Sequence, residues 1–192
     1  MWPLTDRFSD ALTAAVDIHE GQLRKGTDTP YIAHLLGVAS TVLELGGDED
    51  AVIAALLHDA LEDQHHRVTE QDLRDRFGDH VAAIVVGLSD YIGPDPSNKP
   101  DWRLRKETYL AHLGAETDPA TVRVSLADKL YNVTALRRDL ERLGPSVWDR
   151  FTVGSDEQLW YHESLAEIFR AKAPGPLTEE YATTVARLRE LS

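Results

Sequence analysis

Two short stretches of this sequence place ionisable side chains where a buried helix would carry apolar ones. His58 and Asp59 directly follow the apolar run 52–57, and Asp128 lies within a second apolar stretch, 122–130. An unpaired carboxylate in such a setting is costly, and a bound metal ion removes that cost. The pattern therefore predicts a metal site that contains His58, Asp59 and Asp128.

His34, in the segment 30–34, offers a second imidazole for the same ion. Two imidazoles and two carboxylates leave positions open to water, and a divalent cation makes water a better nucleophile at neutral pH. Taken alone, His34 is more often a satisfied core histidine and Asp128 a buried ion-pair partner. The combined pattern His58-Asp59-x-x-Glu62-Asp63 is much more specific.

Glu62 and Asp63 come just after the predicted donors. Glu62 lies four residues after His58 and three after Asp59, so the three side chains share one face of a helix. Because other residues already serve the ion, we expect Glu62 and Asp63 to orient or deprotonate the attacking water.

The segments that must position these residues have helical sequence patterns nearly throughout, so the predicted fold class is all-α. Residues 1–192 are expected to form a single helical domain. The expected helix starts and stops follow from capping residues, proline, glycine and the 3.6-residue apolar period. A first helix is capped by Thr5, with an apolar face reaching Leu23. The other expected helices are 30 to about 45 with Thr29-Pro30 at its start, 51 to about 63 after Asp48, 70–78 opened by a capping box at Thr69, a short apolar segment 81–88, 102–113, 119–143 after Asp118, one capped by Ser155 up to Phe169, and a last one capped by Thr178.

The segment 89–101 is rich in proline, glycine and aspartate and is expected to be a loop long enough to act as a lid. No run of alternating strand residues and no internal repeat is present in the sequence.

Composition narrows the possible partners. The 192 residues carry a formal net charge of −13, which disfavours non-specific nucleic-acid binding. The absence of cysteine fits a reducing compartment, and the first residues lack the pattern of a secretory signal. No apolar run is long enough to cross a membrane. We therefore expect a cytoplasmic protein that binds neither nucleic acid nor membrane; the oligomeric state stays open.

Four ordered motifs resemble the hydrolase domain of RelA/SpoT homologues, and most of all the stand-alone small alarmone hydrolases of the HD superfamily. These motifs are Arg24-Lys25-Gly26 with Thr29-Pro30-Tyr31-Ile32-Ala33-His34, then Leu57-His58-Asp59-Ala60-Leu61-Glu62-Asp63 followed by Asp72-Leu73 and Phe77-Gly78, then Leu88-Ser89-Asp90 with Arg105-Lys106, and Leu126-Ala127-Asp128-Lys129-Leu130-Tyr131-Asn132. They follow the family order over roughly residues 15–169.

The resemblance implies one Mn2+ per chain, held by His34, His58, Asp59 and Asp128. It also implies that Glu62 and Asp63 act on water and that a small nucleotide, ppGpp or pppGpp, loses its 3′-pyrophosphate in a stringent-response reaction. The positions implied for substrate binding are Arg24, Lys25, Arg103, Arg105, Asn132 and, by looser alignment, Tyr161.

Several alternatives stay open at this stage. The residue that meets the phosphates can be Lys99, Arg103, Arg105 or Lys106. The substrate can instead be another 2′- or 3′-phosphorylated nucleotide, such as NADPH or an adenosine alarmone. A non-catalytic nucleotide sensor is disfavoured because Glu62 and Asp63 are both present.

Overall fold

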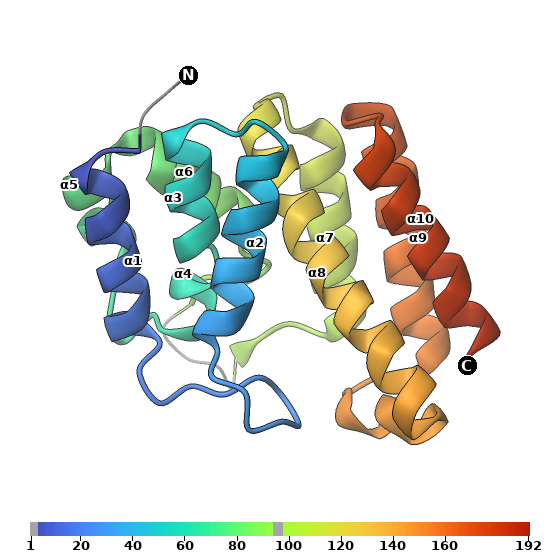
Figure 1. The fold of residues 1–192 in the computed structure, drawn as a ribbon. Helices are drawn as coiled ribbons and strands as arrows, with labels where there is room; N and C mark the ends of the chain where they lie inside the picture. Colours follow the sequence, from blue (N-terminus) through green and yellow to red (C-terminus); the bar gives the residue numbers. More distant parts are fainter. Residues whose placement is uncertain (1–3, 94–97) are drawn as a thin grey trace.

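The computed structural model describes residues 4–93 and 98–192, and it is all-α, as the sequence predicts (Figure 1). Among these residues the one isolated β-type pairing is an antiparallel bridge between Leu23 and Pro30. The elements are α1 (Asp6–Ile18), α2 (Ile32–Glu44), α3 (Glu49–Leu57), α4 (Ala60–Asp63), α5 (Glu70–Phe77), α6 (Asp79–Leu88), α7 (Trp102–Ala115), α8 (Pro119–Leu143), the 3-10 helix η2 (Pro145–Arg150), α9 (Ser155–Lys172) and α10 (Pro176–Glu190).

Several helices begin where capping chemistry predicts. The Thr5 hydroxyl accepts a hydrogen bond from the Arg7 amide at the start of α1. Thr69 and Asp72 form the predicted capping box of α5, and Asp118 caps α8 with Pro119 at its first position. Each cap pairs a backbone amide that the first helical turn leaves without a partner.

Helix α8 joins two hydrophobic cores. One of its faces, with Ala120, Val124 and Ala127, belongs to the core built by α1, α2, α3, α5 and α6. Another face, with Val122 and Leu126, belongs to the core of α7, α9 and α10. Figure 1 shows α8 between the helices of these two groups. Asp128 is therefore placed near the line where the two cores meet.

Gly37 lets α2 approach α8 closely. A Cβ atom at Gly37 would overlap the ring of Tyr131, far inside van der Waals contact. His34 lies one turn before Gly37 on α2, and Asp128 lies one turn before Tyr131 on α8. The missing side chain thus allows the two site-bearing turns to come together.

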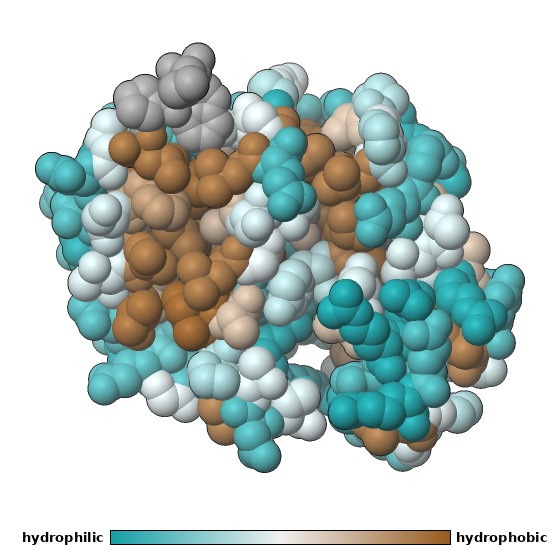
Figure 2. Space-filling model, in the orientation of Figure 1, coloured by the Kyte–Doolittle hydropathy of each residue, from teal (hydrophilic) through white to brown (hydrophobic). Residues whose placement is uncertain are grey.

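One face of the molecule is unusually apolar. Figure 2 shows hydrophobic side chains gathered over α1 and α2, whereas hydrophilic side chains dominate the opposite side of the same view. Val16 on α1 and Leu36 on α2 are 49% and 45% exposed. Among the described residues, no helix has both the length and the apolar character that a membrane span requires.

Some predicted helix starts are wrong. Pro30 does not open α2, because its segment forms the bridge to Leu23, and α2 begins at Ile32. Leu23 does not extend the face of α1 but is 50% exposed in the loop that follows. In both cases a local turn takes precedence over the helical pattern.

Two predicted capping residues also have other roles. Gly154, not Ser155, occupies the N-cap of α9, and Ser155 is its first helical residue. Helix α10 begins at Pro176 after Gly175, so Thr178 lies inside it. The Thr178 hydroxyl donates to the Ala173 carbonyl oxygen at 2.5 Å and thereby ties the preceding turn to α10.

The predicted helix 51–63 is interrupted at its functional residues. Helix α3 ends at Leu57 and α4 begins at Ala60, with His58 and Asp59 in the turn between them. Consecutive side chains on a regular helix point about 100° apart, so two neighbours cannot easily meet at one point. The interruption brings His58 Nε2 within 3.0 Å of Asp59 Oδ2.

Candidate metal centre and nucleotide pocket

Four predicted metal donors converge where the first turn of α2 and the end of α3 meet the middle of α8. His34 Nε2 lies 3.2 Å from His58 Nε2 and 3.2 Å from Asp128 Oδ1. The separations of His34 Nε2 from Asp59 Oδ2 and of His58 Nε2 from Asp128 Oδ1 are 3.5 and 3.6 Å. The two imidazoles and Asp128 are 1%, 3% and 5% exposed. The site is thus a compact set of nitrogen and oxygen donors, three of them buried, with the Asp59 side chain 22% exposed.

The donor set fits a divalent cation. Two donors that each lie about 2.1 Å from one ion, at right angles, are about 3 Å apart, which agrees with the separations above. His58 Nδ1 lies 2.8 Å from the Ala55 carbonyl oxygen, so it donates there and leaves the Nε2 lone pair facing the other donors. Two imidazoles with two carboxylates suit manganese, iron or zinc better than they suit magnesium or calcium.

The carboxylates are held in place by neighbouring side chains. The Tyr31 hydroxyl donates to Asp59 Oδ2 at 2.5 Å. Lys129 Nζ and Asn132 Nδ2 donate to the two oxygens of Asp128, each at 2.6 Å. Such outer hydrogen bonds fix the orientation of metal-binding groups.

The electrostatics of the four donors also favour a positive charge among them. Burial opposes protonation of His58, yet the neighbouring Asp59 and Asp128 carboxylates raise the pKa of this imidazole well above its ordinary value. The two carboxylates thus favour a positive charge at this point.

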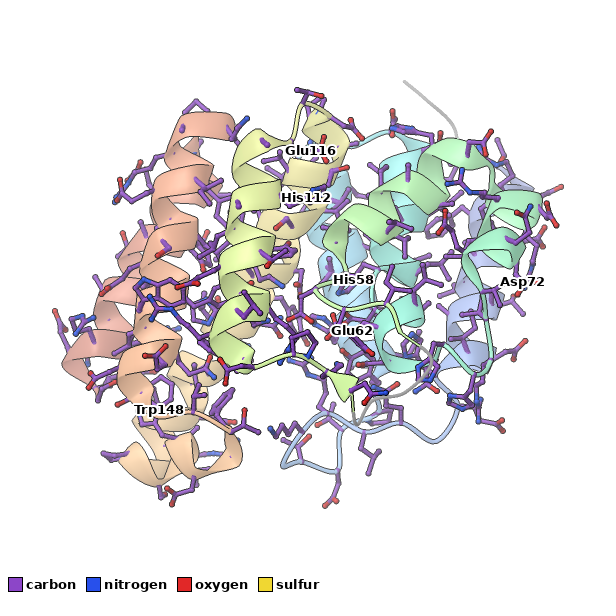
Figure 3. All side chains as sticks on the ribbon, turned by 180° about the vertical axis from the view of Figure 1, so that it is seen from behind. His58, Glu62, Asp72, His112, Glu116 and Trp148 are labelled. Atoms are coloured by element: carbon purple, nitrogen blue, oxygen red, sulfur yellow. The ribbon has the colours of Figure 1, made fainter. Side chains whose placement is uncertain are left out.

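Glu62 lies beside the donors on α4, and Figure 3 shows it near His58 in the middle of the molecule. Burial, together with the Asp90 and Asp59 carboxylates, raises the pKa of Glu62 to about 7. A carboxylate with a pKa near neutrality is well suited to accept a proton. Glu62 also contacts the loop after α6, because its Oε2 accepts from the Asp90 amide at 3.3 Å and its Oε1 lies 3.3 Å from Lys99 Nζ.

Asp63 faces a cavity of about 520 Å³ next to the metal donors. Its Oδ2 accepts from Gln22 Nε2 at 2.7 Å. This glutamine also accepts from Gln64 and lies 2.7 Å from His19 Nδ1, so it belongs to a small polar network behind Asp63. Gln22 was not selected from the sequence, because an isolated glutamine in a loop is ordinary.

Four of the predicted substrate-binding residues line this cavity: Arg24, Lys25, Asn132 and Tyr161. Arg24 Nη2 donates to Asn132 Oδ1 at 2.7 Å, across 108 residues of sequence. The Arg24 guanidinium also lies 5.5 Å from the ring centre of Tyr31. The Tyr161 hydroxyl is buried and has no hydrogen-bond partner among the described residues, and its ring lies 4.8 Å from Lys106 Nζ.

Arg103 and Arg105 lie outside the cavity wall. Arg103 forms ion pairs with Glu107 and Glu157. Arg105 Nη1 lies 2.6 Å from Asp90 Oδ2, within the loop contact described above. Of the four cations considered for the phosphates, Lys106 is the one that lines the cavity.

The expected lid 89–101 is described only in part, since residues 94–97 lie outside the described ones. On the two sides of this gap, Asp90 and Lys99 both contact Glu62. Movement of this segment stays a prediction.

Comparison with curated proteins finds long relatives, of which this chain matches a small part, and a short relative that it matches over most of its length. A 3′-pyrophosphohydrolase acting on guanosine-3′,5′-bis(diphosphate), from Haemophilus influenzae, is 39% identical over 127 residues; the match covers 64% of this chain and 17% of that protein. The mouse protein MESH1, which carries the same enzyme name, is 34% identical over 147 residues, with 75% of each chain covered. The chain thus spans only about a sixth of the longer bacterial relative.

Two solved structures resemble the structure of this chain. A structure described as "A metazoan ortholog of SpoT hydrolyzes ppGpp and plays a role in starvation responses" has a TM-score of 0.76 at 26% identity, covering 100% of this chain and 99% of that one. A protein from Listeria monocytogenes has a TM-score of 0.69 at 31% identity, covering 82% of this chain and 99% of that one.

The family described as "HD domain" matches residues 11–153, a range that contains all four candidate metal donors together with Glu62 and Asp63. Since that match spans well over half of the sequence, and MESH1 is matched over three quarters of its length, this chain belongs to the HD domain family.

Proposed function

We propose that this protein is a metal-dependent hydrolase that removes the 3′-pyrophosphate of the alarmones ppGpp and pppGpp, giving GDP or GTP and pyrophosphate. The observation that carries the proposal is the convergence of His34, His58, Asp59 and Asp128 beside a cavity of about 520 Å³. The names of the relatives support the choice of substrate.

The proposed metal ligands are His34, His58, Asp59 and Asp128, with one Mn2+ per chain. When bound, a divalent cation stabilises negative charge that develops on the phosphate and increases the acidity of water. The mixed nitrogen and oxygen donor set supports manganese over magnesium.

In the proposed reaction, two carboxylates of the chain act on the attacking water. Glu62 accepts a proton from water while the water oxygen attacks the phosphorus next to the 3′-oxygen, and Asp63 orients that water. The bond between phosphorus and the 3′-oxygen breaks, and the 3′-oxygen leaves with the electron pair and then takes up a proton. The pKa of Glu62, about 7, supports its role as the base.

Cationic residues of the cavity are proposed to bind the nucleotide. Lys106 and Arg105 both pair with Asp90 at 2.6 Å, but Lys106 alone of the two lines the cavity, so Lys106 is assigned to the phosphates. We assign Arg24, Lys25, Asn132 and Tyr161 to the nucleoside and its 5′-phosphates. Arg105 is assigned no direct contact with the nucleotide; its ion pair holds Asp90, which contacts Glu62. Arg103 is assigned only to contacts with parts of the nucleotide that extend outside the cavity.

We further propose that residues 1–192 form one domain and that the protein works in the cytoplasm. The structural match over 100% of this chain supports the first point, and the lack of cysteine fits the second.

A nucleotide panel tests the function. The purified protein with Mn2+ is incubated with ppGpp, pppGpp, the adenosine counterpart of ppGpp and NADPH, and the products are identified. We expect GDP or GTP and pyrophosphate from the guanosine alarmones. Release of phosphate from NADPH alone would replace the proposal with an NADPH phosphatase.

The metal assignment is tested separately with His58→Ala. Elemental analysis is expected to show about one divalent cation per wild-type chain and a largely empty variant that is inactive on ppGpp. His66→Ala is the matched control, since His66 is an exposed histidine a few residues away. Full metal content and activity in His58→Ala would refute the site.

A further inference from the structure

The cavity extends along one face of α8, away from the metal donors. Asn132, Leu136 and Asp139 all line it at helical spacing. Asp139 lies eleven residues after Asp128, which is about three helical turns and about 16 Å along the axis. Eleven residues also return the side chain to nearly the same helix face. The cavity is therefore long enough for a nucleotide whose phosphate lies at the metal end.

The two ends of the cavity differ in chemistry. At the metal end, the lining includes Lys106 and Lys129. At the far end it is mainly apolar, with Leu136, Val147 and Phe151. Lys25 Nζ lies 5.7 Å from the ring centre of Phe151, and an ion pair between Asp139 and Arg150 interrupts the apolar walls.

Asp139 and Arg150 form this pair at the far end of the cavity. Arg150 Nη1 lies 2.6 Å from Asp139 Oδ2, and each side chain is 24% exposed. Arg150 also packs against the loop that carries Arg24 and Lys25, because a Cβ at Gly26 would lie 2.9 Å from its side chain. The pair is thus fixed between α8 and that loop, with a carboxylate and a guanidinium side by side.

This environment fits a nucleobase better than a phosphate. A phosphate would meet the Asp139 carboxylate, and the guanidinium nearest to it is already paired. A base buries two flat apolar faces and forms hydrogen bonds only at its edge. The faces of the base can pack against the apolar side chains of Leu136, Val147 and Phe151. Its edge can form hydrogen bonds with the Asp139–Arg150 pair.

We propose that Asp139 and Arg150 recognise the base and select guanine over adenine. Guanine offers two adjacent N–H donors, at N1 and N2, to the Asp139 carboxylate, and its O6 accepts from Arg150. Adenine in the same position turns a lone pair at N1 towards the carboxylate and an amino group towards the guanidinium. A polar site of this kind strongly disfavours the ligand that leaves its groups unpaired. The inference rests on the proposed function and specifies the base that this function takes.

Substitution of Asp139 tests this assignment. The kcat/KM for ppGpp and for its adenosine counterpart is measured with Mn2+ in wild type, Asp139→Asn and Asp139→Ala. We expect wild type to prefer the guanosine substrate and both variants to lose about 10- to 100-fold of that preference, because a hydrogen bond to a charged group is lost. The loss should lie in KM for ppGpp, with kcat nearly unchanged. Glu141→Gln is the matched control, because Glu141 is an exposed carboxylate on α8 that pairs with Arg137.

Two outcomes would overturn the inference. One is an unchanged guanine preference in both Asp139 variants. The other is an equal loss for the two substrates, which would mean that Asp139 supports the fold or the phosphates. If wild type hydrolyses neither nucleotide, the proposed function fails instead. Titration calorimetry of GDP and ADP with the same variants then still decides the role of Asp139, since it requires no catalysis.

Discussion

At the scale of single residues, the site separates the groups that would hold a cation from the group that would accept a proton. The Nε2 atoms of His34 and His58 lie 3.2 Å apart, and each lies 3.0–3.6 Å from an oxygen of Asp59 and of Asp128. Glu62 is adjacent but makes its own contacts with Asp90 and Lys99. This separation leads to a kinetic prediction.

Glu62→Gln is expected to lower kcat for ppGpp by about 10²–10⁴, the usual contribution of a general base. Metal content and KM should stay near the wild-type values, since glutamine keeps the shape of the side chain and four other residues are proposed to hold the ion. Elemental analysis and steady-state kinetics check both points. Loss of the metal from this variant would make Glu62 a ligand.

The candidate metal donors could be selected from the sequence because each interrupts an apolar run, as His58 and Asp59 do after Leu57. Residues whose role depends on contacts distant in the chain could not be identified in this way. Arg24 meets Asn132 across 108 residues. Asp139 reads as an ordinary exposed residue of an amphipathic helix until Arg150 is placed beside it. Without the family resemblance, which supplied Arg24 and Asn132, such loop and helix-surface residues require the folded chain.

At the scale of elements, helix type and order were predictable, and helix starts were less so. Side-chain caps at Thr5, Thr69 and Asp118 are visible in the sequence and were predicted correctly. The interruption between α3 and α4 was not predicted, because apolar periodicity continues through it. It directs His58 and Asp59 to one point, which a continuous helix would not do.

Gly37→Ala tests the close approach of α2 and α8. The added methyl group would overlap the Tyr131 ring, so we expect a loss of about 1–3 kcal/mol in the free energy of unfolding and weaker metal binding. Gly114→Ala is the matched control: a methyl group at Gly114 in α7 would meet no atom within 4 Å, and alanine should stabilise the helix by about 0.5–1 kcal/mol. Urea unfolding and metal titration provide the measurements. Equal behaviour of the two variants would contradict the packing argument.

At the scale of the whole molecule, the two hydrophobic cores meet along α8, and the cavity lies beside that helix. His162 on α9 is part of this arrangement, since it lines the cavity and is 8% exposed. Its Nδ1 and the Tyr181 hydroxyl of α10 share a hydrogen bond at 2.8 Å. The neutral imidazole therefore links the two C-terminal helices.

His162 is expected to make the fold sensitive to acid. Burial, followed by the charges of Lys129 and Lys106, lowers the pKa of His162 from 6.5 to about 3, with Asp128 opposing them. The unfolded chain binds a proton below pH 6.5 whereas the folded chain does not, so this stabilisation is complete above pH 6.5 and is lost as the pH falls towards 3. Between pH 7 and pH 5 the loss from this one group is about 2 kcal/mol.

Urea unfolding at pH 7 and pH 5 checks this expectation in wild type, His162→Gln and His112→Gln. His162→Gln should be less stable than wild type at pH 7, because the bond to Tyr181 is altered, but it should lose about 2 kcal/mol less on acidification. His112 has a 53% exposed side chain on α7, so His112→Gln should follow the wild-type pH dependence. Parallel curves for wild type and His162→Gln would show that the buried imidazole does not set the acid limit of the fold, whereas a flatter curve for His162→Gln alone would assign that limit to the contact between α9 and α10.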